Sequence, residues 1–256
     1  MAPRLETITR VLLIAQFVAL PLLILRIWLA GIQRKYVFFT TYLAISFVQI
    51  AISYIIPYSS PAYGYVFVFS EMLIVVFYVL IVLELYSKVL APLEGLAAMA
   101  QQYVGGAICV AALASLGLLY FESSASNLVE RFLVFERVMI FSLVLFVLFI
   151  VGFLTYFPVS LSRNVIVYST GYAVFFLAKA ASIFARNTQV LDYRVVDEIH
   201  LAVNDLCLLF WAVYLRRAGE VAKMTLGHRS NPRDEHRVIE QLDAINKMLS
   251  RLPRHK

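Results

Sequence analysis

Charged residues are scarce in this chain of 256 residues: 15% are Asp, Glu, Lys or Arg, whereas 62% are hydrophobic. The mean hydropathy is +0.82. A soluble domain of this length does not need so much apolar surface, and uncharged apolar runs of about 18 or more residues indicate transmembrane helices. The net charge of +6 is modest. We therefore expect a lipid bilayer as the main partner of the chain, and no nucleic acid.

Cysteine is equally scarce, and the motifs of common membrane enzymes are missing. Cys109 and Cys207 both lie in apolar runs, so neither suggests a secreted disulfide framework. The last apolar run has no lysine for a retinal Schiff base, and only His200 is available inside the apolar runs, whereas haem between helices needs paired axial ligands. The chain has no HExxH motif, no CxxC pair and no phosphate-binding loop. We therefore expect no enzyme, no metal site and no cofactor.

The apolar runs define an all-α, polytopic membrane protein. A cleavable signal peptide is not expected, because the run after Arg10 is too long and lacks a small-residue cleavage site. Prolines and polar linkers separate the runs, and residues 1–217 are predicted to form a seven-transmembrane-helix bundle. The seven predicted spans are 8–30, 36–56, 65–90, 103–121, 131–157, 164–185 and 196–217.

The remaining residues, 218–256, form a polar tail that is predicted to carry one amphipathic helix, 232–252. Pro232 is favourable at a first helical position, and Pro253 ends the pattern. Three alternatives remain for the contacts of this helix. It docks on the bundle, it lies on anionic lipid, or it pairs with a cytoplasmic protein partner or a second copy of the chain. An apolar stripe with spacings of four and three residues runs along it: Val238, Leu242, Ile245, Leu249 and Leu252.

The distribution of Lys and Arg sets the expected orientation. The short loops barely discriminate between the two sides, but Arg216-Arg217 and the basic tail favour a cytoplasmic C-terminus. Because the predicted number of spans is odd, the N-terminus is then outside. The expected location is a bacterial cytoplasmic membrane.

Polar residues recur inside the predicted spans at a similar depth. Counting about 1.5 Å per residue from the outer ends places them roughly 8–14 Å below the outer surface. Ionisable groups in hydrocarbon are costly, so they normally face the bundle interior and pair with one another. The predicted polar layer contains Gln16, Gln49, Glu71, Glu136, Arg137, Lys179, His200, Asn204 and Asp205.

Asp205 is the central member of this layer, and we expect it to pair with Lys179 or Arg137. Asn204 points about 100° away from it, so only one of the two can face the centre, and lipid exposure costs a carboxylate more than an amide. The layer is either an outward-opening polar pocket or ion path, or a structural network that fixes helix register. His200 is either a proton acceptor or an interfacial hydrogen-bonding group.

Two short stretches carry a resemblance to a known group of proteins. They are Leu83-Glu84-Leu85-Tyr86 and Phe157-Pro158-Val159-Ser160-Leu161-Ser162-Arg163-Asn164. Over most of residues 30–215 the chain resembles small seven-span bacterial membrane proteins of acidobacterial type, which have no assigned activity to carry over. Its layout is also similar to the seven-span sensor regions that precede bacterial histidine kinases, although the tail is too short for a kinase domain.

The function expected from these features is non-enzymatic. We predict a sensor or binding protein with an outward-facing polar pocket for a small ligand or ion, coupled to the cytoplasmic helix 232–252. The alternatives are a small-solute or proton-coupled transporter, a lipid-active enzyme using Glu71, His200 and Asp205, and an accessory subunit of a membrane complex. No inverted repeat is visible, and the inner half has few polar steps, which disfavours the transporter.

Overall fold

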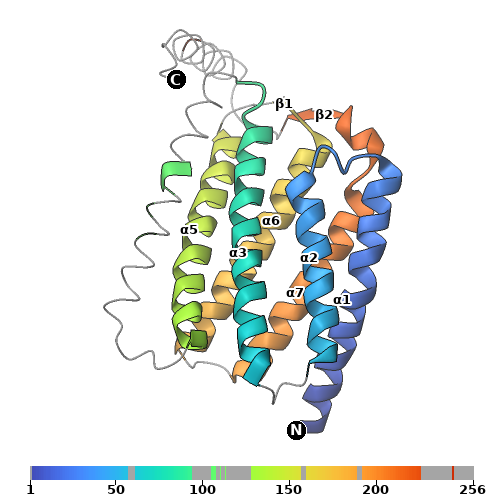
Figure 1. Ribbon diagram of the computed structural model, residues 1–256. Helices are drawn as coiled ribbons and strands as arrows, with labels where there is room; N and C mark the ends of the chain where they lie inside the picture. The colour runs from blue at the N-terminus through green and yellow to red at the C-terminus, as the bar shows by residue number, and fades with distance from the viewer. Residues whose placement is uncertain are drawn as a thin grey trace.

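The computed structural model of the chain is almost entirely helical (Figure 1). It describes residues 2–56, 61–93, 105–107, 110, 113, 128–156, 160–188, 192–225 and 244. This confirms the all-α prediction. The long helices of the described part are α1 (Ala2–Ala30), α2 (Val37–Ile55), α3 (Pro61–Val89), α5 (Leu128–Tyr156), α6 (Arg163–Thr188) and α7 (Tyr193–Tyr214). The short elements are β1 (Ser160–Ser162), the 3₁₀ turn η1 (Arg217–Glu220) and β2 (Lys223–Thr225).

Local sequence explains where several helices begin and end. Gly31 has φ +69°, and the amides of Gly31 and Ile32 bond the carbonyls of Trp28 and Ile27 at 2.9 and 3.2 Å. This is a Schellman ending, which favours glycine at that position. The side chain of Asp192 accepts a hydrogen bond from the amide of Arg194 at 3.0 Å and so caps α7. Six of the seven predicted ranges coincide with described helices, and the largest difference is at α1, which begins six residues before the predicted start.

Four described helices are long and apolar enough to cross a membrane, in the ranges Thr7–Ala30, Tyr63–Val89, Arg131–Leu154 and Arg163–Arg186. This is the composition of a membrane protein. Helix α2 contributes a shorter apolar stretch, Val37–Ile52, and α7 is too rich in charge in its first half to be among the four.

Two predictions concern residues that the structure does not describe, apart from a few single positions. The predicted span 103–121 is described only at 105–107, 110 and 113, which are helical. The predicted amphipathic helix 232–252 is described only at 244, so its stripe of Val238, Leu242, Ile245, Leu249 and Leu252 lies outside the described residues. The seven-span bundle and the tail helix both stay predictions.

The helices are arranged in a closed cycle. Helix α1 packs on α2, α2 on α3, α3 on α5, α5 on α6, α6 on α7 and α7 on α1, while α3 also contacts α6. Helices α1, α3, α5 and α7 run in one direction, and α2 and α6 run in the other (Figure 1). The strands β1 and β2 pair antiparallel at one end of the bundle, with Leu161 opposite Met224. We call this the ribbon end, and the opposite one, where α1 begins, the N-terminal end.

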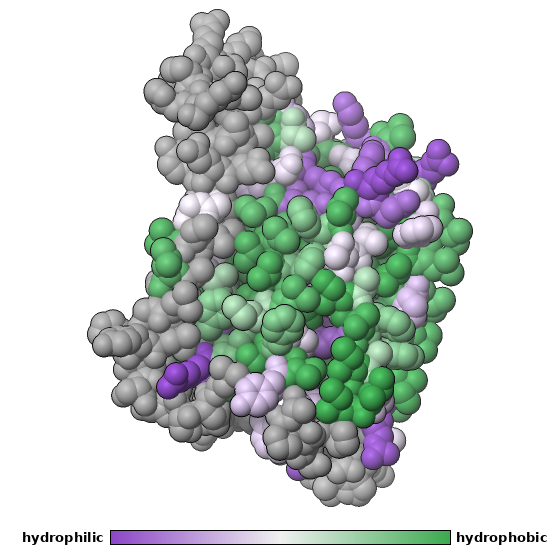
Figure 2. All heavy atoms as spheres, viewed as in Figure 1, coloured by the Kyte–Doolittle hydropathy of each residue, from purple (hydrophilic) through white to green (hydrophobic). Residues whose placement is uncertain are grey.

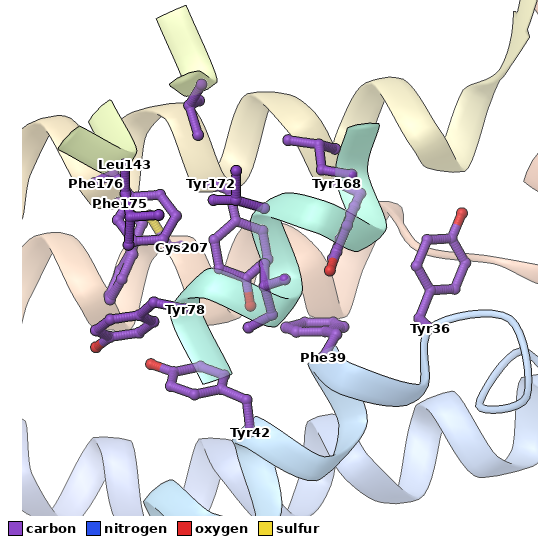
Figure 3. Packing of buried hydrophobic residues seen from close by; sticks show 14 of the residues in the cluster. Tyr36, Phe39, Tyr42, Tyr78, Leu143, Tyr168, Tyr172, Phe175, Phe176 and Cys207 are labelled. Atoms are coloured by element: carbon purple, nitrogen blue, oxygen red, sulfur yellow. The ribbon is translucent and has the colours of Figure 1, made fainter. Parts of the chain in front are cut away.

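Aromatic side chains fill the middle of the bundle (Figure 3). The ring of Trp211 on α7 lies 4.7 Å from that of Tyr172 on α6 and 5.0 Å from that of Phe39 on α2, measured between centroids. Gly171 permits this packing, because a Cβ there would lie only 2.2 Å from Nε1 of Trp211. The outer faces of the helices are apolar as well, with Leu29, Phe69 and Leu145 exposed by 80%, 76% and 69%. Figure 2 shows this hydrophobic band over the helices and hydrophilic residues gathered at the ribbon end, as a bilayer-embedded bundle requires.

Candidate functional site

A buried ion pair joins α5 and α6 within the predicted polar layer. Nζ of Lys179 lies 2.8 Å from Oε1 of Glu136, and the two side chains are only 12% and 11% exposed. The same ammonium donates a hydrogen bond of 3.4 Å to the hydroxyl of Tyr78 on α3 and lies 4.9 Å from the centroid of its ring. We call Tyr78, Glu136 and Lys179 the Lys179 cluster. It ties three helices together, and a buried pair of this kind is tolerable only while both partners are present.

A second polar contact joins α2 and α3. Nε2 of Gln49 donates to Oε1 of Glu71 at 2.8 Å and to Oγ of Ser70 at 3.3 Å. Beside it is a cavity of about 20 Å³, which is room for about one water-sized group. The cavity is lined by Gln49, Ile52, Tyr63, Val66, Phe67 and Ser70.

The third part of the layer is the contact between the parallel helices α1 and α7. Oγ1 of Thr9 donates to Oε1 of Glu198 at 3.1 Å, which fixes the register of the two helices near the N-terminal end. Gln16 and Asp205 each follow seven residues later, and each is 9% exposed. Both carboxylate oxygens of Asp205 are buried and have no hydrogen-bond partner.

The expected pairing of Asp205 with Lys179 or Arg137 is therefore wrong. The reason is helical phase, because residues two apart on a helix point about 200° apart. Cys207 faces α6, where its thiol lies 3.8 Å from the carbonyl oxygen of Gly171. Asp205 is consequently directed away from α6, toward α1, while Lys179 is held by Glu136. Arg137 is half-buried on α5, which packs on α3 and α6.

The other two residues of the predicted layer on α7, His200 and Asn204, do not lie on the same face as Asp205. His200 faces α6, with its ring 6.4 Å from that of Phe175, and its Nδ1 is buried without a hydrogen-bond partner. Asn204 is half-buried, whereas the neighbouring Asp205 is buried. The predicted layer contains three contacts between different pairs of helices, because depth alone does not specify the direction in which each side chain points, and Glu71 and His200 lie within electrostatic range of Lys179.

A polar cluster at the ribbon end was missed by the sequence analysis. The carboxylate of Glu220 accepts hydrogen bonds from Nδ2 of Asn164 at 2.7 Å and from the hydroxyl of Tyr36 at 2.9 Å, and it pairs with Nζ of Lys35 at 3.0 Å. Asn164, which is fully buried, also bonds both backbone groups of Arg216, at 2.8 and 3.3 Å. We call Lys35, Tyr36, Asn164 and Glu220 the clasp. It fastens the chain after α7 to the start of α6 and to the turn between α1 and α2.

Close packing and electrostatics both support the clasp. A Cβ on Gly219 would lie 2.2 Å from Oδ1 of Asn164, so only glycine allows the η1 turn to approach this closely. Burial on its own would raise the pKa of Glu220, but the hydrogen bonds from Asn164, Lys35 and Tyr36 outweigh it and lower that pKa below its ordinary value. Glu220 is therefore an anion at neutral pH, fixed by three donors.

The ribbon end is more polar than expected from the sequence. The hydroxyl of Tyr168 donates to Oε2 of Glu84 at 3.0 Å, and Lys88 donates to the backbone carbonyl of Lys35. Residues 218–225, which were assigned to the tail, belong structurally to this end because β2 pairs with β1. The sequence gives no clear signal for this cluster, because the asparagine at the start of α6 and the glycine that follows Arg216-Arg217 belong to no hydrophobic repeat.

Neither a metal-ligand group nor a similar known protein gives further information about the site. Within the described ranges, no group of three or more His, Cys, Asp or Glu side chains is placed to hold a metal ion. No family model, curated protein or solved structure matches the chain. The functional interpretation therefore depends on the geometry of the polar contacts and of the clasp.

Proposed function

We propose that the protein is a non-enzymatic sensor or binding protein of a bacterial cytoplasmic membrane. A small ligand or ion enters from the N-terminal end of the bundle, and the resulting change passes to a cytoplasmic partner through the C-terminal segment. The observation that carries the proposal is the course of α7. This helix contributes His200 and Asp205 to the polar contacts and then leads directly into Glu220 of the clasp, after which β2 and the tail follow.

The charge distribution supports a cytoplasmic ribbon end. Among the described residues, the acids at this end are the partly buried Glu84 and Glu220, whereas Asp192, Asp197 and Glu198 offset the cations of the other end. An excess of Lys and Arg marks the cytoplasmic side. The exposed cations of the ribbon end are Arg26, Arg34, Lys35, Arg163, Arg216, Arg217 and Lys223.

The direction of the helices supports seven crossings. Helices α3 and α5 are parallel neighbours: Gly64 lies near Val129 toward one end, and the hydroxyl of Tyr86 donates to the carbonyl of Phe146 at 3.0 Å toward the other. Helix α3 thus ends at the ribbon end, whereas α5 begins at the N-terminal end (Figure 1). A span within 103–121 would make this connection.

Binding is favoured over transport by the packing of the interior. The rings of Phe39, Tyr172 and Trp211 are fully buried between the Lys179 cluster and Glu84. No charged side chain of the described residues bridges that distance, whereas a carrier needs a polar route across the membrane. The small cavity beside Gln49 suits a single ion or a very small polar molecule.

A spectroscopic distance measurement tests the proposal. Spin labels at Arg34→Cys and Val221→Cys, in a background with Cys109→Ser and Cys207→Ser, would report on the clasp in lipid nanodiscs. The probes are NaCl, KCl and MgCl2, each added at constant neutral pH. We expect at least one probe to shift the distance distribution, and the double variant Glu136→Gln/Lys179→Met to abolish the shift while the protein stays folded. A response unchanged in that variant, or no response to any probe, would contradict the proposal.

A further inference from the structure

The carboxylate of Asp205 is a buried acid with no counter-charge among the described residues. The residue is 9% exposed, and neither oxygen has a hydrogen-bond partner. An isolated carboxylate anion in hydrocarbon is very costly, and in practice such a group neutralises or takes a partner. The position therefore requires either a bound cation or a proton.

The register of α1 and α7 places Gln16 opposite this acid. The helices run parallel, with the Thr9–Glu198 hydrogen bond near one end and Arg26 donating to the carbonyl of Val213 at 3.2 Å near the other. Gln16 lies seven residues after Thr9 on α1, and Asp205 lies seven residues after Glu198 on α7. Seven residues are about two turns and about 10 Å along the axis, so the facing relationship is preserved.

Gln16 belongs to the buried face of α1. That face is a stripe with spacings of four, three and four residues, in which Gln16 is the polar member. A single polar residue in an otherwise apolar stripe between parallel helices costs stability and so indicates a specific partner. The stripe consists of Gln16, Leu20, Leu23 and Ile27.

The charged groups on the helices around Asp205 are engaged elsewhere or point elsewhere. On α1, Arg10 is exposed and Arg26 bonds α7 at the ribbon end. On α6, Lys179 is paired with Glu136 and Arg186 with Asp197 of α7. On α7 itself, Glu198 is bonded by Thr9, and His200 faces α6. A metal ion is disfavoured because Gln16 and Asp205 supply too few oxygen ligands for a hard cation.

We propose that Asp205 and Gln16 form a proton-binding site in the contact between α1 and α7. The bound form is the neutral carboxylic acid, whose O–H donates to the side-chain carbonyl of Gln16, while the Gln16 amide donates to the other oxygen of Asp205. The site loads when a hydronium ion that reaches it from the N-terminal end transfers a proton to an Oδ atom, so that one O–H bond of the hydronium breaks, the carboxylic O–H forms and water is left. It unloads by the reverse transfer to water, which leaves an anion that the Gln16 amide alone among the described side chains is placed to solvate, and this loosens α1 from α7. The site does not depend on the proposed ligand or on the Lys179 cluster.

Infrared difference spectroscopy of the full-length protein in nanodiscs tests the site. The stretching band of a protonated carboxylic acid should be present at neutral pH in the wild type and absent in Asp205→Asn. The matched control is Glu198→Gln, which removes an acid from the same face of α7, and it should keep the band. Gln16→Met should move the band to higher frequency, because the carbonyl of the acid loses a hydrogen bond.

Thermal unfolding in the same nanodiscs separates this site from a purely structural role. Asn imitates the neutral acid, so Asp205→Asn should melt near the wild type at neutral pH and should lack the decline that the wild type shows as the pH is raised. Absence of the band from the wild type at neutral pH, its persistence in Asp205→Asn, or its insensitivity to Gln16→Met would overturn the proposal.

Discussion

Asn164 and Glu220 lie 56 residues apart in the chain, and a hydrogen bond of 2.7 Å joins them at the ribbon end. The side chain of Asn164 simultaneously donates to the carbonyl of Arg216 and accepts from its amide. One buried amide thus satisfies both the backbone of the chain after α7 and the carboxylate that the η1 turn presents. This pair attaches the C-terminal segment to the bundle together with the β1–β2 pairing and the contacts of Glu220 with Lys35 and Tyr36.

Removing the Asn164 side chain should detach the segment after α7. Asn164→Ala leaves the Glu220 carboxylate and the backbone of Arg216 without a partner, and a lost hydrogen bond to a charged group costs about 1.5–3 kcal/mol. We expect a lower melting temperature in detergent, together with protease cleavage between 216 and 225. Arg163→Ala, an exposed neighbour, serves as the control and should behave like the wild type. Equal stability of Asn164→Ala and wild type would show that the clasp contributes nothing.

The close approach at Gly219 gives a second prediction. Gly219→Ala places a methyl group 2.2 Å from Oδ1 of Asn164, so the turn or the amide has to move. Overpacking of this kind costs about 1–3 kcal/mol. The matched control is Gly152→Ala on α5, where nothing lies within 4 Å of the new Cβ, and alanine is favoured over glycine in a helix by up to about 1 kcal/mol. Thermal melts should therefore shift in opposite directions for the two variants.

Acid should weaken the clasp before it weakens the bundle. The pKa of Glu220 is lower in the folded protein than its ordinary value of about 4.3. A group with a depressed pKa stabilises the fold above that ordinary value, and this contribution is lost as the pH falls through the folded pKa. We expect protease sensitivity at 216–225 to rise as the pH falls below that ordinary value. In Glu220→Gln, which has no carboxylate to titrate, the sensitivity should be higher at neutral pH and nearly independent of pH.

The orientation can be tested with reporters at the C-terminus. A phosphatase that is active only outside the cytoplasm and a fluorescent protein that folds only inside it are fused in turn to Lys256. The basic ribbon end favours a cytoplasmic C-terminus, so only the fluorescent fusion should be active. A phosphatase signal from the fusion at Lys256 would reverse the orientation and also the direction from which we propose that the ligand enters.

Apolar run length could predict the described helices, because backbone hydrogen bonds must be satisfied within each span in lipid. Proline and glycine lie at two helix ends, since α3 begins at Pro61 and Gly31 follows the last residue of α1, although the sequence predicted that the third span begins only at residue 65. Depth counting correctly placed Glu136 and Lys179 at the same level, where they pair.

The partners of the polar residues could not be predicted from depth. Asp205 and Lys179 are at a similar depth, yet Asp205 faces α1 and Lys179 faces α5. The partner of each side chain depends on its direction around its own helix and on which helices are neighbours in the cycle. The clasp could not be predicted from the sequence either. It joins Lys35, Asn164 and Glu220 through loops and a 3₁₀ turn, in which no hydrophobic period records the tertiary contact.

The role of the buried Glu136–Lys179 pair can be decided with a double-mutant cycle. Lys179→Met alone strands the Glu136 carboxylate, and breaking a buried pair in this way costs about 3–5 kcal/mol. Glu136→Leu/Lys179→Met removes both charges and should be milder than either single change. Lys179→Met combined with Asp205→Asn is the matched control: these residues do not pair, so their effects on the free energy of unfolding should add within about 0.5 kcal/mol. Restored stability together with a lost response of the clasp to the ions would assign the pair to the binding site. Restored stability with an intact response would make it architecture, and additive effects of Glu136→Leu and Lys179→Met would contradict the ion pair itself.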